Sequence, residues 1–218
     1  MRRGPELLDI HQRMLDRLGP SGWWPGDSPF EVALGAVLTQ NASWANVAKA
    51  IANVRKAGLL HPMKLAALPE HELAELIRPS GYYRIKAKRL RHLLAFLESE
   101  DAADLQLGQL RRQDPHDLRR RLLAVNGVGP ETCDSILLYA LDMPFFVVDA
   151  YTFRMLNRHG LVPEDAGYQE MQDLFMDALD PDPMLFNEFH ALIVRTAAAW
   201  CRKKAPLCHE CPLGELLP

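Results

Sequence analysis

Apolar residues recur at three- and four-residue intervals along almost the whole chain, and this periodicity constrains the fold more than any other feature of the sequence. Helical runs are predicted over 30–39, 45–57, 63–77, 86–97, 118–125, 132–141, 152–158, 171–179 and 186–199. The best strand signal, Phe145–Val148, is only four residues long, and Pro and Gly mark the joints between the runs. The sequence therefore predicts an all-α protein of about ten short helices with short loops.

Composition narrows the class of protein. A chain of 218 residues that is 48% hydrophobic and 24% charged is long and apolar enough to bury a core, so global disorder is excluded. No apolar run approaches the roughly 20 residues of a membrane helix, and no secretory segment follows the start. We therefore expect a cytoplasmic protein, nucleoid-associated in a prokaryote, that is a monomer with no membrane contact.

Charge is unevenly distributed, although the net charge is only −3. The run 78–91 has six basic residues and no acid, whereas 164–188 has eight acids and no Lys or Arg. Two solvated helix faces would explain the pattern. A basic surface that faces a polyanion, with the acidic surface turned away, would explain it equally well. The small net charge argues against coating nucleic acid by bulk charge and allows a local grip.

The stretch 122–154 is the most informative part of the chain. A helix is predicted to end near Asn126, the turn Gly127-Val128-Gly129 follows, and a second helix starts at Pro130 or Glu131. Two glycines in a tight turn at a helix start can expose backbone N–H groups to an anion such as a phosphate. Such a turn can also do no more than end a helix.

Asp149 directly precedes another helical run and is an N-cap candidate. A cap needs no chemistry, yet the two roles are compatible, because a carboxylate at a helix start stays ionised and fixed in place.

The run Gly127-Val128-Gly129-x-x-Thr132, followed by Val147-Val148-Asp149, resembles the helix-hairpin-helix and Asp signature of the endonuclease III superfamily of DNA glycosylases. The similarity covers most of the chain and includes 38–41, 81–83 and the C-terminal cysteines. It implies an all-α fold with two domains and a DNA cleft between them. One domain is expected over 23–142, with the hairpin at about 117–141. The other would combine 1–22 with 143–218 and carry a cysteine loop at 201–217. The resemblance also implies that Asp149 is catalytic and that the Gly127–Gly129 turn grips a phosphate.

One departure from the family pattern points to the reaction. The superfamily members that also cut the strand carry a lysine nucleophile two residues after the second hairpin glycine, and Glu131 stands at that position here. We therefore expect a monofunctional glycosylase that uses water. The alternatives are a bifunctional glycosylase and lyase for oxidised pyrimidines, or a non-catalytic hairpin protein that only tethers DNA.

Aromatic residues suggest the substrate. Trp23-Trp24-Pro25, Leu34–Asn41 and Arg78–Leu90 are similar to the 3-methyladenine DNA glycosylase branch, which also has Glu at the lysine position. The resemblance implies a substrate pocket lined by Trp23, Trp24 and Trp44, and we assign Glu131 to the same pocket. Stacked rings can hold a cationic alkylated base at roughly 0.5–2 kcal/mol per contact. Packing in a core would also explain each Trp.

The expected partner is double-stranded DNA with damaged bases, and the target nucleotide would flip out of the stack. Gln40 would fill the vacated space, although it could also be an ordinary polar helix end. The remaining predicted DNA contacts are Asn41, Arg84, Lys86 and Lys88.

The C-terminal cysteines make an incomplete ligand set. The spacing Cys201-x6-Cys208-x2-Cys211 fits the family's iron–sulfur loop, but Leu217 stands at the fourth position. A [4Fe–4S] cluster is usually held by four thiolates. Three interpretations stay open: a cluster with three protein thiolates and an outside ligand, which we favour slightly, another metal such as zinc with His209 contributing, or a loop without metal.

Overall fold

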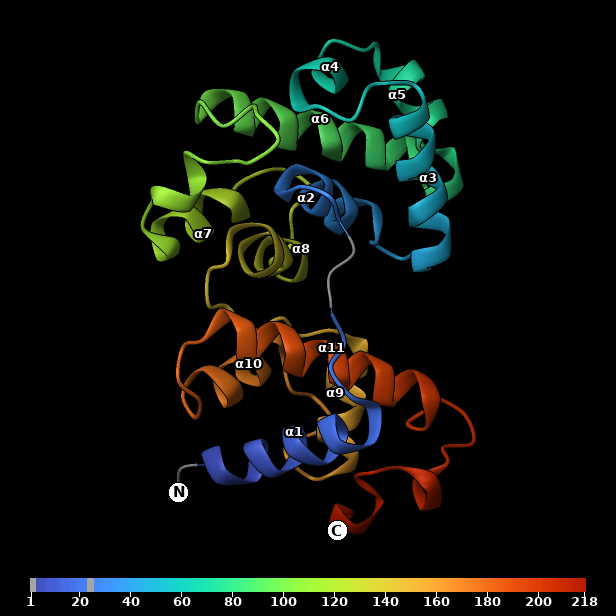
Figure 1. Cartoon of the computed structure of the whole chain (residues 1–218), viewed down its shortest axis with the longest axis vertical. Coiled ribbons are helices and arrows are strands. Elements are labelled where there is room, and N and C mark those ends of the chain that lie inside the picture. The colour runs from blue at the N-terminus through green and yellow to red at the C-terminus, as the bar shows by residue number, and fades with distance from the viewer. Residues whose placement is uncertain (1–2, 23–25) are drawn as a thin grey trace. The chain divides into compact units, whose positions relative to one another are not determined.

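The structure is a computed structural model that describes residues 3–22 and 26–218 of the chain. The chain divides into two compact units: unit 1 is Met1–Trp23 with Pro144–Pro218, and unit 2 is Trp24–Met143. All regular secondary structure in the described residues is helical, so the predicted all-α class is confirmed (Figure 1).

Unit 2 is built around one apolar helix. Its elements are α2 (Pro29–Leu38), α3 (Trp44–Lys56), α4 (Pro62–Ala66), α5 (Glu70–Leu76), η1 (Arg78–Ser80), α6 (Tyr83–Ser99), η2 (Leu110–Arg112), α7 (Pro115–Leu123), α8 (Pro130–Ser135) and the π-helical turn η3 (Ile136–Ala140). Every residue of α2 from Phe30 to Leu38 is buried, and α3, α6, α8 and η3 pack around it (Figure 1). Ser28 starts α2 as its N-cap by accepting the N–H of Glu31.

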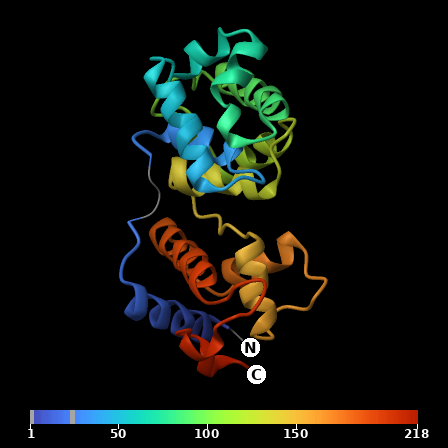
Figure 2. The same cartoon turned by 90° about the vertical axis from the view of Figure 1, so that its right-hand side faces the viewer.

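Unit 1 contains both ends of the chain (Figure 2). Its elements are α1 (Gly4–Leu18), α9 (Ala150–Arg158), α10 (Tyr168–Met176), α11 (Pro183–Ala199), η4 (Cys208–Glu210) and η5 (Gly214–Leu216). Phe146 and Phe175 stack at 3.7 Å between ring centroids, and Phe186 and Phe189 pack edge-on against this pair. Through Phe186 and Phe189, α11 packs on the buried pair of Phe146 and Phe175.

The predicted strand signal Phe145–Val148 is a buried extended segment and forms no strand in the described residues. Side chains replace the missing partner strand. The Phe146 N–H contacts Met176 Sδ at 3.3 Å, and Gln172 Nε2 donates to the Phe146 carbonyl at 2.7 Å. The polar backbone groups of Phe146 are thus satisfied, and the segment leads directly to Asp149.

Three helix predictions need correction. The run 63–77 is two helices, α4 and α5, because Pro69 cannot continue a helix and instead caps the start of α5. The helix of the run 132–141 starts at Pro130, one of the two starts predicted for it, but its C-terminal half is a π-helical turn and not an α-helix. The sequence reasoning also missed α1, whose buried residues include Leu7, Ile10 and Met14 at helical spacing. No helix in 3–22 or 26–218 is long and apolar enough to cross a membrane.

Candidate active site and nucleic-acid interface

Asp149 is the N-cap of α9 and one of its oxygens is fully engaged in that cap. Oδ1 accepts the N–H of Tyr151 at 2.9 Å, the N–H of Thr152 at 2.8 Å and the Thr152 hydroxyl at 3.0 Å. The structure thus has the cap that the sequence predicts. The carboxylate cannot turn freely, and Oδ2 is the oxygen left for chemistry.

The surroundings of Asp149 favour its charged form. Burial is the largest single influence and acts to raise the pKa. The imidazole of His190, whose Nε2 lies 3.7 Å from Oδ2, together with the N–H and hydroxyl of Thr152, outweighs burial, so the pKa of Asp149 lies below its ordinary value. Asp149 is therefore ionised at neutral pH in a site where its side chain is only 14% exposed. Sequence reasoning missed His190, a buried polar residue of α11 that lies among mostly apolar neighbours.

The hairpin in unit 2 joins α7 to α8 through a turn that requires glycine. Gly127 has φ of +92°, and a Cβ there would overlap the side chain of Arg89. In the described part of the chain, the N–H groups of Gly127 and Gly129 find no acceptor. Both can therefore donate to an external anion, as the sequence predicts for a phosphate.

Gln40 ties the end of α2 to this turn. Its Nε2 donates to the Gly127 carbonyl at 3.1 Å and to Thr132 Oγ1 at 2.8 Å, while its Oε1 accepts from Arg89. From the outer side, His92 Nδ1 lies 3.0 Å from the Asn126 carbonyl. Gln40, which we predict fills the space of the flipped nucleotide, is thus bonded to the turn that we predict binds a phosphate.

A buried ion pair fixes the two hairpin helices. Arg119 of α7 donates to Asp134 of α8 through Nε at 2.6 Å and Nη2 at 3.0 Å, and the Asp134 side chain is completely buried. Next to it, burial raises the pKa of Cys133 to about 12, so this thiol is neither a nucleophile nor a ready metal ligand.

Only part of the basic run is exposed on α6. Arg84 and Lys88 are exposed one turn apart. Lys86 is 1% exposed, and its Nζ donates to the carbonyls of Leu38 at 2.7 Å and Ser80 at 2.6 Å. The prediction that Lys86 contacts DNA is therefore corrected: its ammonium closes the C-terminal ends of α2 and η1 and is not presented to a phosphate. Burial, with the nearby charge of Arg89, lowers its pKa to about 8.

The aromatic residues are only partly described. Trp23 and Trp24 lie outside the described residues. Trp44, half-buried at the start of α3, lines an open hollow of about 530 Å³ together with Glu31, Ile51 and Arg55. Of the predicted site residues that the structure describes, only Trp44 lines this hollow. Glu131 is exposed in the first turn of α8.

A second aromatic residue in unit 2 escaped the sequence reasoning. Tyr82 is 70% exposed and adopts the left-handed conformation with φ of +45° immediately before α6. Tyr82, Gln40, Asn41 and Arg89 share one hollow of about 110 Å³. Asn41 is also left-handed, with φ of +52°, and exposed. A bulky exposed residue with positive φ is uncommon, and this was a signal that sequence alone could not give.

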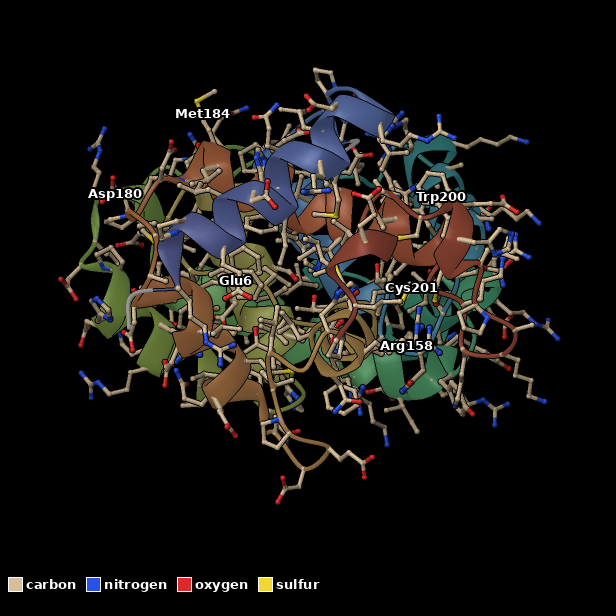
Figure 3. The ribbon with its side chains drawn as sticks, turned by 90° about the horizontal axis from the view of Figure 1, so that it is seen from below. Glu6, Arg158, Asp180, Met184, Trp200 and Cys201 are labelled. Atoms are coloured by element: carbon tan, nitrogen blue, oxygen red, sulfur yellow. The ribbon has the colours of Figure 1, made fainter. Side chains whose placement is uncertain are left out.

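The three-cysteine loop, Cys201–Leu217, follows α11 in unit 1. Cys201, Cys208 and Cys211 line one cavity of only about 10 Å³, roughly the room for a single water-sized particle. Arg158 Nη1 lies 3.1 Å from Cys201 Sγ, as the labels in Figure 3 help to locate. Burial is the largest cause that raises the pKa of Cys211, and the neighbouring thiols add to it.

These residues do not fit a four-thiolate cluster. Leu217 stands where the fourth thiolate is needed, and a guanidinium contacts the first sulfur. His209, the suggested zinc ligand, is exposed and pairs with Glu210 at 3.2 Å. Among the residues that the structure describes, no group of three His, Cys, Asp or Glu side chains could hold a metal ion. We therefore derive no step of the reaction through a metal or cluster.

Comparison with known proteins identifies the family. Residues 34–181 match the model of the HhH-GPD superfamily base excision DNA repair proteins. The chain belongs to this superfamily. It is therefore an HhH-GPD DNA glycosylase of base excision repair.

The relatives of this HhH-GPD protein span almost the whole chain. A protein of Methanocaldococcus jannaschii with a provisional assignment as a DNA repair glycosylase is 46% identical, over 96% of this chain and 94% of its own length. The H. pylori 3-methyladenine DNA glycosylase MagIII, solved with 1,N6-ethenoadenine, is 28% identical with a TM-score of 0.76 and covers 91% of this chain and 98% of its own. A complex of endonuclease III with DNA has a TM-score of 0.82, covering 100% of this chain and 96% of its own, and its 23% identity supports the fold alone.

Proposed function

We propose that this HhH-GPD protein is a monofunctional DNA glycosylase that hydrolyses the N-glycosidic bond of alkylated purines such as 3-methyladenine. The observation that carries the proposal is that both positions expected to act on the DNA sugar hold carboxylates and that neither holds an amine. Asp149 is an ionised carboxylate held in place, and Glu131 stands where an amine nucleophile would be needed for lyase chemistry. The likeness to a 3-methyladenine DNA glycosylase over 91% of this chain supports the choice of substrate.

An alkylated purine needs little help from the enzyme to leave the sugar. A purine alkylated at N3 carries positive charge, so the bond from C1′ to the base breaks with its electron pair returning to the base, which leaves neutral. The sugar becomes an oxocarbenium-like cation. Asp149 would stabilise that cation, and Oδ2 would take the proton of the water that adds to C1′. No protonation of the base and no covalent enzyme intermediate is required.

Aromatic rings would select the cationic base. We assign this role to Trp23, Trp24 and Trp44, with Glu131 adding a negative charge to the same pocket. Each ring over a cation would contribute roughly 0.5–2 kcal/mol. A neutral oxidised pyrimidine gains little from such contacts, which favours alkylated purines as substrates.

Backbone N–H groups and basic side chains would bind the DNA phosphates, and other side chains would occupy the space left by the flipped nucleotide. The free N–H groups of Gly127 and Gly129 would bind one phosphate, and Arg84 and Lys88 would bind the neighbouring backbone. Gln40 would fill the space of the flipped nucleotide, since its amide is already tied to the turn. Tyr82 would stack on a neighbouring base from the same hollow, with Asn41 beside it.

The partner of this site would be double-stranded DNA with a damaged base, bound by a single copy of the chain. We accordingly propose that the protein works at the nucleoid, in the cytoplasm of a prokaryote.

The test is release of free bases from methylated duplex DNA, followed by chromatography of the products. We expect 3-methyladenine among them and no nicking of the abasic strand. Duplexes with oxidised pyrimidines are incubated in parallel with borohydride. A trapped covalent adduct, or release of oxidised pyrimidines alone, would overturn the proposal in favour of a bifunctional enzyme.

A matched variant separates binding from chemistry. Glu131→Gln keeps the size of the side chain and removes its charge. We expect slower release of the cationic base with unchanged affinity for undamaged duplex, because the contact proposed for Glu131 is to the base. Equal loss of affinity for both DNAs would contradict the assignment of Glu131 to the base pocket.

A further inference from the structure

We propose that His190 of α11 is a positioning residue for Asp149: its buried ring faces Oδ2 and holds that oxygen in the orientation the reaction needs. The proposal rests on the proposed function only for its kinetic readout. Neither the family signature nor the spacing of residues in the sequence points to this histidine.

Asp149 and His190 meet inside unit 1, where α9 packs against α11. The His190 side chain is 7% exposed, and its Nε2 lies 3.7 Å from Asp149 Oδ2. The ring nitrogen thus faces this oxygen at slightly more than an ordinary hydrogen-bond distance. A small change in either side chain would bring the two atoms into hydrogen-bond range.

The two oxygens of Asp149 have different surroundings. Oδ1 already accepts three hydrogen bonds from the start of α9. His190 faces the other oxygen, the one left to meet the reacting sugar or water. A group that holds Oδ2 therefore acts on chemistry without being needed for the cap.

His190 itself is held in place by the aromatic core. The adjacent Phe189 packs edge-on against Phe146 and Phe175 at 5.7 and 5.3 Å between ring centroids. On the other side, Val148 is buried directly before Asp149. The backbone on both sides of the contact is thus clamped, which is what a positioning residue requires.

Other titratable groups around α11 have different partners. His11 of α1 lies against Phe189 and is influenced by Glu188, and Glu188 accepts hydrogen bonds from Ser21. Arg195 donates to the carbonyls of Leu18 and Gly19. Among the described residues, His190 is thus the titratable side chain that acts on the pKa of Asp149.

The experiment compares His190→Leu and His190→Gln with wild type, with His11→Leu as the control for removing a half-buried histidine from the same packing. Single-turnover base release from methylated DNA is measured across pH. We expect His190→Leu to lose about tenfold or more at neutral pH and to move the acid limb of the profile to higher pH, because burial of the carboxyl is then opposed only by the hydrogen bonds at the start of α9. His190→Gln, which keeps an N–H donor, is expected to recover most of the rate, and His11→Leu to leave the profile unchanged.

A second readout does not depend on substrate. Thermal unfolding is measured across acidic pH for wild type, His190→Leu, Asp149→Asn and the double variant. The pKa of Asp149 is lowered by folding, so its contribution to stability is present above the unfolded pKa and is lost as pH falls through the folded pKa. We expect this acid-dependent term to shrink in His190→Leu and the two substitutions to be non-additive.

Each result decides the proposal. Additive effects on unfolding, or a His190→Leu pH profile that superimposes on wild type after scaling, would show a structural role only and overturn it. If the effects of His190→Leu and Asp149→Asn on unfolding are non-additive but wild type releases no base from methylated DNA, the positioning role of His190 stands and the proposed substrate is refuted. If His190→Leu does not fold, His190→Gln and His190→Asn are compared, and equal rates and profiles for these two would overturn the proposal.

Discussion

Replacing Asp149 separates the charge of this residue from its cap. In Asp149→Asn, the amide oxygen of the new side chain can still accept the N–H groups of Tyr151 and Thr152, so the variant keeps the cap and removes the charge. A carboxylate about 4 Å from a developing cation, at an effective dielectric constant of about 20, attracts it by ~4 kcal/mol. That energy corresponds to about a thousandfold in the rate of base release.

Asp149→Ala provides the contrast, because it removes both charge and cap. Loss of the cap costs about 1 kcal/mol, which lowers the Tm of a chain of this size by roughly 2–4 °C. We expect both variants to lose base release, and Asp149→Ala to lose more Tm than Asp149→Asn, because Asp149→Asn loses only the contribution of the charge. The assays are single-turnover base release, thermal unfolding, and fluorescence anisotropy with undamaged duplex, for which all three proteins should have similar affinity. Base release by Asp149→Asn within tenfold of wild type would refute the electrostatic role.

Four further outcomes follow from the contacts in unit 2 and the cysteine loop. Gly127→Ala should weaken binding to undamaged duplex, since a Cβ there overlaps a neighbouring arginine at positive φ, whereas Gly108→Ala, in open space, should not. The pKa of Lys86 is about 8 in the folded protein and near 10.5 in the unfolded chain, so the free energy of unfolding of wild type should rise with pH between these two values. Lys86→Met should remove this rise and leave the salt dependence of DNA affinity unchanged. Arg119→Ala, which leaves a buried carboxylate unpaired, should cost about 3–5 kcal/mol of unfolding free energy, whereas Arg120→Ala, which removes an exposed ion pair, should change it little. Protein purified without oxygen should lack a thiolate-to-iron absorption band, and chelator should leave its Tm unchanged; a visible band that chelator or oxygen bleaches would contradict our interpretation of the three-cysteine loop.

The fold class and the cap at Asp149 could be predicted because both follow from local spacing. The periodicity of α2 and the turn at Gly127 are written in a few neighbouring residues. The break at Pro69 was also local, but the apolar spacing on both sides of it concealed the joint.

What the sequence could not show depends on residues that are distant in the chain. Lys86 lies in a basic run, and only the packed structure shows that its ammonium donates hydrogen bonds to the carbonyls of Leu38 and Ser80. The pairing of His190 with Asp149 arises because α11 folds back onto α9, which no spacing rule reports. Family spacing predicted a metal loop from the cysteines, whereas the space between the side chains decides whether a cluster fits.

Unit 1 is assembled from the two ends of the polypeptide, and this has a consequence for synthesis. Helix α1 packs on α11, and Arg195 of α11 binds the last carbonyls of α1. At ribosomal rates of about 5–20 residues per second, α1 emerges roughly 10–40 s before the helix that covers it. During that interval the nascent chain displays Leu7, Ile10 and Met14 to solvent, while the intervening unit 2 can already fold. A chaperone that binds short apolar segments would find its target in α1.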